Sequence, residues 1–94
     1  MQDKEKLLTT GETGALLHRA NRTIQSWGLS WERAARASGN SNLPSSPAIG
    51  LRRSGADAGR ALYDQRDIDE YVENSVREVV GQAPLNWRKD NDHE

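Results

Sequence analysis

The 94-residue sequence contains no cysteine and no phenylalanine, and it has only one methionine and three prolines. Without cysteine the chain forms no disulfide, offers no thiolate ligand to a metal and has no thiol nucleophile. Apolar residues make up 34% of the sequence and the mean hydropathy is -0.91, so the core must be small. We expect one small domain near the size limit for independent folding, without a deep substrate cavity.

Long apolar runs are missing as well. The N-terminal segment is charged, and no apolar segment of about 20 residues, the length that spans a bilayer, follows it. A signal peptide needs an apolar stretch near the N-terminus, which this sequence lacks. These absences predict a cytoplasmic protein that has no membrane partner.

Side chains suited to catalysis or metal binding are few and scattered. His18 and His93 lie far apart, and no carboxylate cluster at ligand spacing accompanies them. The glycines Gly50, Gly55 and Gly59 do not form a phosphate-binding loop, because no GxxxxGK[ST] pattern is present. No Ser-His-Asp arrangement stands out. We therefore predict that the protein is not an enzyme and uses no metal, no cofactor and no small-molecule substrate.

The net charge of -1 conceals a strong polarity along the chain. Residues 18–60 carry seven basic and two acidic side chains, whereas residues 61–94 carry four basic and nine acidic ones. All seven basic residues of the middle segment are arginine, whose planar guanidinium suits phosphate oxygens and guanine edges. The middle segment is thus either a nucleic-acid-binding surface or a solvated surface rich in arginine.

The first helix is predicted from its capping signal. Thr9 followed three residues later by Glu12 is the pattern of a capping box. A helix should therefore begin near Thr10 and end near His18. Gly14 lies in its middle, where glycine costs about 1 kcal/mol of helix propensity relative to alanine.

A second short helix is predicted for residues 21–27, with Asn21 as a candidate N-cap. Ile24 and Trp27 lie three positions apart and share the face that turns to the core. Two short helices joined by a tight turn, the second exposing long polar side chains, are typical of a helix-turn-helix. The candidate recognition residues on the exposed face are Asn21, Arg22, Gln25 and Ser26.

Residues 29–43 are predicted to hold a separate short helix and a loop. Ser30 can cap a helix over residues 31–37, which stops at a Ser-Gly-Asn sequence. The following residues are mostly serine, asparagine and proline, which favours a loop. Arg33 and Arg36 on this helix are candidates for extending a phosphate-contacting surface.

A β-hairpin is predicted between residues 48 and 63. Its strands would cover residues 48–53 and 60–63, on either side of a flexible glycine-containing tip. Three arginines, which are Arg52, Arg53 and Arg60, fall on this hairpin. They suit the minor groove or the flanking phosphates of DNA, where each neutralised phosphate adds a salt-dependent increment of affinity. A disordered basic loop is the alternative.

A final helix is predicted to start after Asp64 as its N-cap and to end at Gly81 and Pro84. Its apolar residues recur at helical spacing, and they are Ile68, Tyr71, Val72, Val76, Val79 and Val80. This stripe continues past the length that a small domain needs. We expect weak self-association at most, with cooperative assembly on adjacent DNA sites, because so few valines bury little area.

Several features near the C-terminus have a second interpretation. The helix at 31–37, or Leu85 and Trp87, would cover the valine stripe within one chain. Residues 81–94 are otherwise predicted to form a mobile polar tail. Five carboxylates near the start of the final helix are expected to be structural and solubilising through capping and the helix dipole. These are Asp64, Asp67, Asp69, Glu70 and Glu73.

Two tryptophans lie in the helical segments of the basic region. Trp27 and Trp31 have the side chains that stack on bases in single-strand-binding proteins. Large apolar residues are scarce in this sequence, however, and both tryptophans occur at helical spacing. We therefore predict that both pack in the core.

The predicted order is helix, turn, helix, basic hairpin and closing helix. Within these predicted elements, the residues that carry a family pattern are Leu8-Thr9, Glu12, Leu16-Leu17, Thr23-Ile24, Trp27, Leu43-Pro44, Ile49-Gly50, Tyr63, Asp67-Ile68 and Tyr71. These residues resemble the register of the small excisionase-like branch of the MerR-type DNA-binding domains, over residues 7–73. The helix at 31–37 looks like an insertion relative to that family.

The resemblance implies a winged helix-turn-helix, mainly α-helical with a small β-hairpin as the wing. We expect this domain to cover residues 7–80, after a flexible N-terminus at 1–6. The implied function is a small, sequence-specific double-stranded DNA-binding protein, bacterial or phage-encoded and nucleoid-associated. It would act as an excisionase-like recombination directionality factor or as a transcription regulator.

Two alternatives stay open. The winged scaffold can serve as a protein-interaction module in which the acidic C-terminal helix binds a basic partner. The same kind of winged domain also occurs as the DNA-recognition part of phage packaging proteins.

Overall fold

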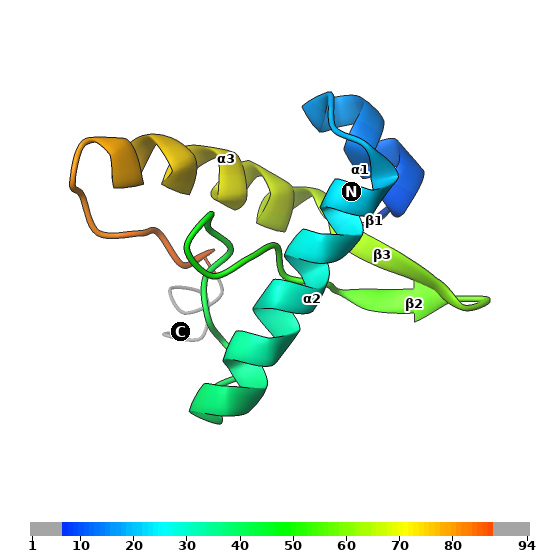
Figure 1. Ribbon diagram of the computed structural model, residues 1–94, viewed down its shortest axis with the longest axis horizontal. Helices are drawn as coiled ribbons and strands as arrows, with labels where there is room; N and C mark the ends of the chain where they lie inside the picture. Colours follow the sequence, from blue (N-terminus) through cyan, green and yellow to red (C-terminus); the bar gives the residue numbers. More distant parts are fainter. Residues whose placement is uncertain (1–6, 88–94) are drawn as a thin grey trace, which may run out of the picture.

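The computed structural model describes residues 7–87. The predicted flexible segment at 1–6 and the last part of the predicted tail, 88–94, lie outside the described residues. The elements in chain order are β1 (Leu7–Thr9), α1 (Thr10–Leu17), α2 (Asn21–Ser38), β2 (Gly55–Asp57), β3 (Arg60–Asp64) and α3 (Gln65–Val79). This part of the chain is mainly helical, with three helices and one small antiparallel sheet (Figure 1).

Helix α1 begins where its capping signal predicts. The Thr9 hydroxyl accepts a hydrogen bond from the Glu12 amide at 3.1 Å, and the Glu12 carboxylate accepts one from the Thr9 amide at 2.9 Å. The helix ends at His18, which adopts the left-handed conformation with φ of 57°. The capping box and both helix boundaries are thus confirmed.

Gly14 lies at the closest approach between α1 and the turn that follows it. It is buried, and its carbonyl accepts a hydrogen bond from the Arg19 amide at 2.8 Å. A Cβ atom on Gly14 would lie 2.6 Å from the Arg19 carbonyl oxygen. Glycine at this position therefore costs helix propensity but allows the turn to fold tightly against α1.

We expect Gly14→Ala to lower the free energy of unfolding by about 1–3 kcal/mol, the usual cost of overpacking. The matched control is Gly11→Ala in the same helix, where the new Cβ would come no closer than 3.9 Å to Thr9 Oγ1. That exchange should raise stability by about 0.4–1 kcal/mol, as glycine replacements do where space and backbone allow. Urea unfolding monitored by circular dichroism measures both, and a stabilised Gly14→Ala variant would contradict the clash.

Helix α2 is one continuous helix of 18 residues, so the prediction of a separate inserted helix within residues 29–43 is wrong. Gly28 does not interrupt it, because a glycine inside a helix costs only about 1 kcal/mol. Packing on both sides outweighs that cost, since Ile24 and Trp31 are both buried. Gly28 also faces Tyr63, since a Cβ at this position would lie 3.0 Å from the Tyr63 hydroxyl oxygen.

The ends of α2 also differ from the prediction. Asn21 is its first residue rather than its cap, and Ala20 at the cap position makes no side-chain capping hydrogen bond. Ser30 caps nothing and instead donates to the Ile49 carbonyl at 2.8 Å. The helix stops at Gly39, which has a φ of 69°. The predicted Ser-Gly-Asn stop is therefore correct, although it ends a longer helix.

The sheet has the strand order β1-β3-β2, with all pairs antiparallel. Leu8 of β1 lies opposite Tyr63 of β3. Strand β1 was not predicted, because three residues carry no readable alternation and their partner strand lies far along the chain. This strand ties the start of the chain to the base of the hairpin.

The hairpin exists, but it is shorter than predicted. Residues 48–53 are not a strand, and β2 forms within the segment predicted to be a flexible tip. The backbone around Gly50 bonds elsewhere: the Gly50 amide donates to Ser46, and the Leu51 amide donates to the Trp27 carbonyl of α2 at 3.1 Å. The turn between β2 and β3 is tight, with positive φ at two successive residues, Ala58 and Gly59, as in type I′ hairpins.

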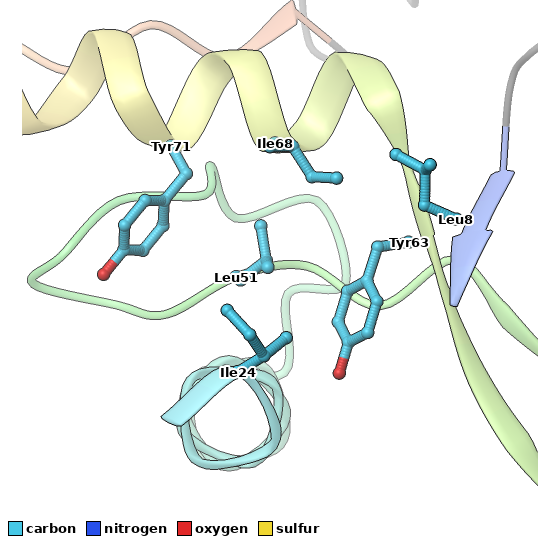
Figure 2. Packing of buried hydrophobic residues seen from close by; sticks show 6 residues of the cluster. All are labelled: Leu8, Ile24, Leu51, Tyr63, Ile68 and Tyr71. Atoms are coloured by element: carbon cyan, nitrogen blue, oxygen red, sulfur yellow. The ribbon is translucent and has the colours of Figure 1, made fainter. Parts of the chain in front are cut away.

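The core lies between α2, α3 and the sheet. Figure 2 shows Ile24 of α2 pointing toward α3, with Ile68 and Tyr71 of α3 pointing back at it. The buried apolar residues that pack into one cluster are Leu8, Ile24, Leu51, Tyr63, Ile68 and Tyr71. Trp27 is half-buried and its ring stacks on that of Tyr71, with 4.5 Å between the ring centroids. Trp31 is buried and its indole N–H donates to the Leu43 carbonyl, so the predicted packing of the tryptophans is confirmed for Trp31 and partial for Trp27.

Helix α3 starts as predicted, with the Asp64 carboxylate accepting a hydrogen bond from the Arg66 amide at 2.9 Å. Asp64, Asp67 and Glu70 are buried together with Asn74, so the prediction that these carboxylates are structural holds for them and the prediction that they are solubilising is wrong; Asp69 and Glu73 are exposed. Hydrogen bonds with backbone groups and side chains of other segments offset the cost of burying these polar groups. The Ser45 amide, for example, donates to Glu70 at 2.9 Å.

The segment after α3 folds back onto that helix, so the prediction of a mobile tail is wrong for its described residues. The indole N–H of Trp87 donates to Asp67 at 2.6 Å, and its amide donates to Glu70 at 2.5 Å. Leu85 exchanges two backbone hydrogen bonds with the Asn74 side chain. Burial raises the pKa of Glu70 above its ordinary value, and the hydrogen bonds from Ser45 and Trp87 oppose that rise.

The valine stripe of α3 remains open. Val72, Val76, Val79 and Val80 are all exposed, Val79 to 86%. Neither the second half of α2 nor Leu85 and Trp87 covers these valines within the described part of the chain. The weak self-association expected from this stripe stays a prediction.

Candidate nucleic-acid interface

A hollow of about 580 Å³ lies where the start of α1, the first half of α2 and the hairpin meet. Figure 1 shows α2 and the β2–β3 hairpin diverging from this point as two arms. Most groups on its wall are polar or basic. The lining includes Thr9, Thr10, Gly11, Asn21, Gln25, Leu29, Arg53, Arg60 and Tyr63.

The four predicted recognition residues share one exposed face of α2. Asn21 and Gln25 line the hollow, and Arg22 and Ser26 are exposed beside them. The side chain of Ile24 points the other way, into the core and toward α3 (Figure 2). The polar face of α2 is therefore turned away from the acidic helix α3. The basic and the acidic segments of the sequence therefore lie on different sides of the fold.

Two of the three predicted hairpin arginines lie at the hollow. Arg60 is the exposed first residue of β3, directly after the tight turn. Arg53 precedes β2 and forms an ion pair with Glu32 of α2, in which both side chains remain partly exposed. Because such a pair is only weakly stabilising in water, a phosphate can compete with Glu32 for the Arg53 guanidinium.

Arg52 does not lie on the hairpin, contrary to the prediction. Its guanidinium lies over the Trp31 ring, 4.9 Å from the ring centroid, and donates to the Leu43 carbonyl at 3.5 Å. Its backbone amide donates to the Ser45 hydroxyl. The reason is the shortened strand, which leaves this residue on the loop that packs against α2. Arg52 therefore holds that loop in place.

Sequence reasoning missed three parts of this hollow. Leu29 was assigned to an interrupted region between two helices, yet it lines the hollow one turn after Gln25. Thr10 at the start of α1 also lines the hollow, because strand β1 fixes the position of that helix. Tyr63 contributes from β3, and burial raises the pKa of its hydroxyl, against a lowering hydrogen bond from Thr10, so the hydroxyl is protonated at neutral pH. Of the three, only Leu29 could have been found from the sequence, because it is a large apolar residue spaced one helical turn from the polar residue Gln25.

The described residues 7–87 also bear on metal binding and on membrane insertion. In this range no group of three or more histidine, aspartate or glutamate side chains is arranged to hold a metal ion. No helix of the same range is long and apolar enough to cross a membrane. Comparison of the sequence with protein-family models and with curated proteins, and of the fold with solved structures, finds no match.

Proposed function

We propose that the protein is a small sequence-specific double-stranded DNA-binding protein of the winged helix-turn-helix type. In this assignment α1 and α2 are the helix-turn-helix, and the β2–β3 hairpin is the wing. The observation that carries the proposal is the hollow where the exposed polar face of α2 meets the hairpin, with Arg53 just before β2 and Arg60 next to the hairpin turn. Its biological role would be that of an excisionase-like recombination directionality factor or a transcription regulator.

The dimensions of DNA suit this assignment. The major groove is about 12 Å wide and accepts one α-helix. With α2 in the groove, Arg22 and Gln25 reach base edges, arginine pairing with guanine and glutamine with adenine. Asn21 and Ser26 lie beside them for further base or phosphate contacts. Arg53 and Arg60 then meet the phosphates that border the groove.

Selection of bound sequences from a random duplex pool tests this proposal directly. The recovered duplex should bind at least 1,000-fold more tightly than random duplex at physiological salt, on the order of the usual margin of specific sites. Equal affinity for both would contradict sequence-specific reading by α2. Absence of any duplex binding would contradict the proposal as a whole.

Arg60→Ala should lower the slope of log K against log salt concentration by about 0.9, the value for one lost phosphate contact. Arg52→Ala is the matched control, because its guanidinium packs on Trp31 rather than on the hairpin. That variant should keep the salt slope and lose about 1 kcal/mol of stability, the scale of a cation–π contact. Fluorescence anisotropy across a salt series measures the slopes. A lower salt slope in Arg52→Ala and an unchanged slope in Arg60→Ala would show that the hairpin is not part of the interface.

A second candidate function rests on a different observation. The exposed valines of α3 form an apolar stripe beside Asp69 and Glu73, which are also exposed. This surface fits a protein-interaction module for a basic partner. Such a module would show little affinity for duplex DNA, so the same salt titration separates the two functions.

A further inference from the structure

The exposed face of α2 continues through both halves of the helix. Its members recur at spacings of three and four residues, which is the period of one helix face. They are Arg22, Gln25, Ser26, Leu29, Arg33 and Arg36, and all are exposed. An interrupted helix would have divided this face in two. The continuity of α2 instead places the last two arginines in line with the proposed recognition residues.

Leu29 is the only large apolar residue on this face. Its side chain is 49% exposed and does not belong to the core cluster. It follows Gln25 by one helical turn and lines the same hollow as Gln25 and Arg60. A side chain in this position contacts the same bound molecule as the neighbouring polar residues.

The major groove offers such a side chain one apolar group on its base edges, the C5-methyl group of thymine. The helix is also longer than the groove is wide. Its 18 residues give a length of about 27 Å, against a groove width of about 12 Å. If Gln25 lies at the centre of the groove, α2 leaves the groove beyond Leu29. The residues that follow Leu29 then lie beside the phosphates that border the groove.

We propose that Leu29 is a specificity-determining residue that contacts the C5-methyl group of a thymine, and that Arg33 and Arg36 bind the adjoining phosphates. This inference rests on the proposed DNA-binding function. It adds a preference for thymine at one position of the site. It also extends the contacted DNA past the part that Arg22 and Gln25 would read.

Single replacement of each thymine by deoxyuridine in the selected duplex tests the methyl contact. One position should lose about fourfold in affinity, the equivalent of one buried methyl group. Leu29→Ala should lose a similar factor and become indifferent to deoxyuridine at that position. The matched control is Leu16→Ala, since Leu16 on α1 is 48% exposed, almost the same as Leu29. That variant should keep the full response to the missing methyl group.

The phosphate contacts are tested on the same duplex. Arg33→Ala and Arg36→Ala should each lower the salt slope by about 0.9. Thermal unfolding checks that every variant keeps its fold. A protein that binds the selected duplex but responds to deoxyuridine equally with and without Leu29 would overturn this inference and leave the proposed function intact. Unchanged salt slopes in both arginine variants would overturn the phosphate part. Absence of duplex binding by the parent protein would overturn the proposed function, and this inference with it.

Discussion

Gly50→Ala should lower the free energy of unfolding by about 2–6 kcal/mol, a large part of the stability of a domain of this size. A Cβ atom at this position would lie 2.4 Å from the Trp31 amide nitrogen and 2.5 Å from the Trp27 carbonyl oxygen. Both are backbone atoms of α2 and cannot rotate away. Gly50 also has a φ of 130°, which side-chain-bearing residues rarely adopt.

The expected loss combines two costs. Backbone strain of this kind costs about 1–3 kcal/mol, and overpacking adds about 1–3 kcal/mol. A domain of this size has a total stability on the order of 5 kcal/mol. The contact between the Gly50 loop and α2 also carries the hydrogen bond from the Leu51 amide to Trp27. Separating the two segments would therefore open the core.

Gly55→Ala separates strain from steric clash. Gly55 has a φ of 152°, but a Cβ atom there would meet nothing within 4 Å. This variant should lose only the strain component, about 1–3 kcal/mol, and remain folded. Urea unfolding followed by tryptophan fluorescence compares the two variants. Equal losses would mean that the approach of Gly50 to α2 contributes nothing to the effect.

Trp27→Ala should lower the free energy of unfolding by about 3 kcal/mol, the low end of the range for a large aromatic residue. The low end applies because Trp27 is only half-buried. Its ring stacks on that of Tyr71 and thereby joins α2 to α3. Few other large apolar groups are present to compensate for its loss.

Trp27→Phe is the conservative control, because it keeps a ring that can stack on Tyr71. It should lose less stability than the alanine variant, because the phenyl ring, although smaller than the indole, leaves a smaller cavity. Denaturant unfolding and duplex binding should be measured on both variants. A Trp27→Ala variant that is as stable as the parent but binds DNA weakly would identify Trp27 as a contact residue instead.

Local signals in the sequence predicted several features of the fold. The capping box of Thr9 and Glu12, the cap at Asp64 and the stop at Gly39 all lie where the sequence indicates. Each of these features depends on atoms within about four residues of one another, so the local pattern contains the information needed. The same reasoning found the exposed face of the first half of α2, because Ile24 shows which side is buried.

Features that depend on distant residues were mispredicted. A glycine such as Gly28 disfavours a helix by propensity, but Ile24 and Trp31 are buried on either side of it and α2 continues through it. Arg52 was placed on the hairpin by sequence position, and Trp31 and Leu43 draw it to the loop instead. For Gly28, the local preference that packing outweighs is about 1 kcal/mol.

The sequence by itself determined both ends of α1, the start of α3 and the exposed polar face of the first half of α2. Only the tertiary structure decided which face of α3 is buried. Helical spacing puts Ile68 and Tyr71 on one stripe with the valines, yet Ile68 and Tyr71 are buried beside Asp67, Glu70 and Asn74 while the valines are exposed. The reason is that Ser45, Leu85 and Trp87, which lie far from these residues in the sequence, supply their hydrogen-bond partners. Burial of a polar group is tolerated only when it has hydrogen-bond partners, and these partners come close to α3 only when the whole chain folds.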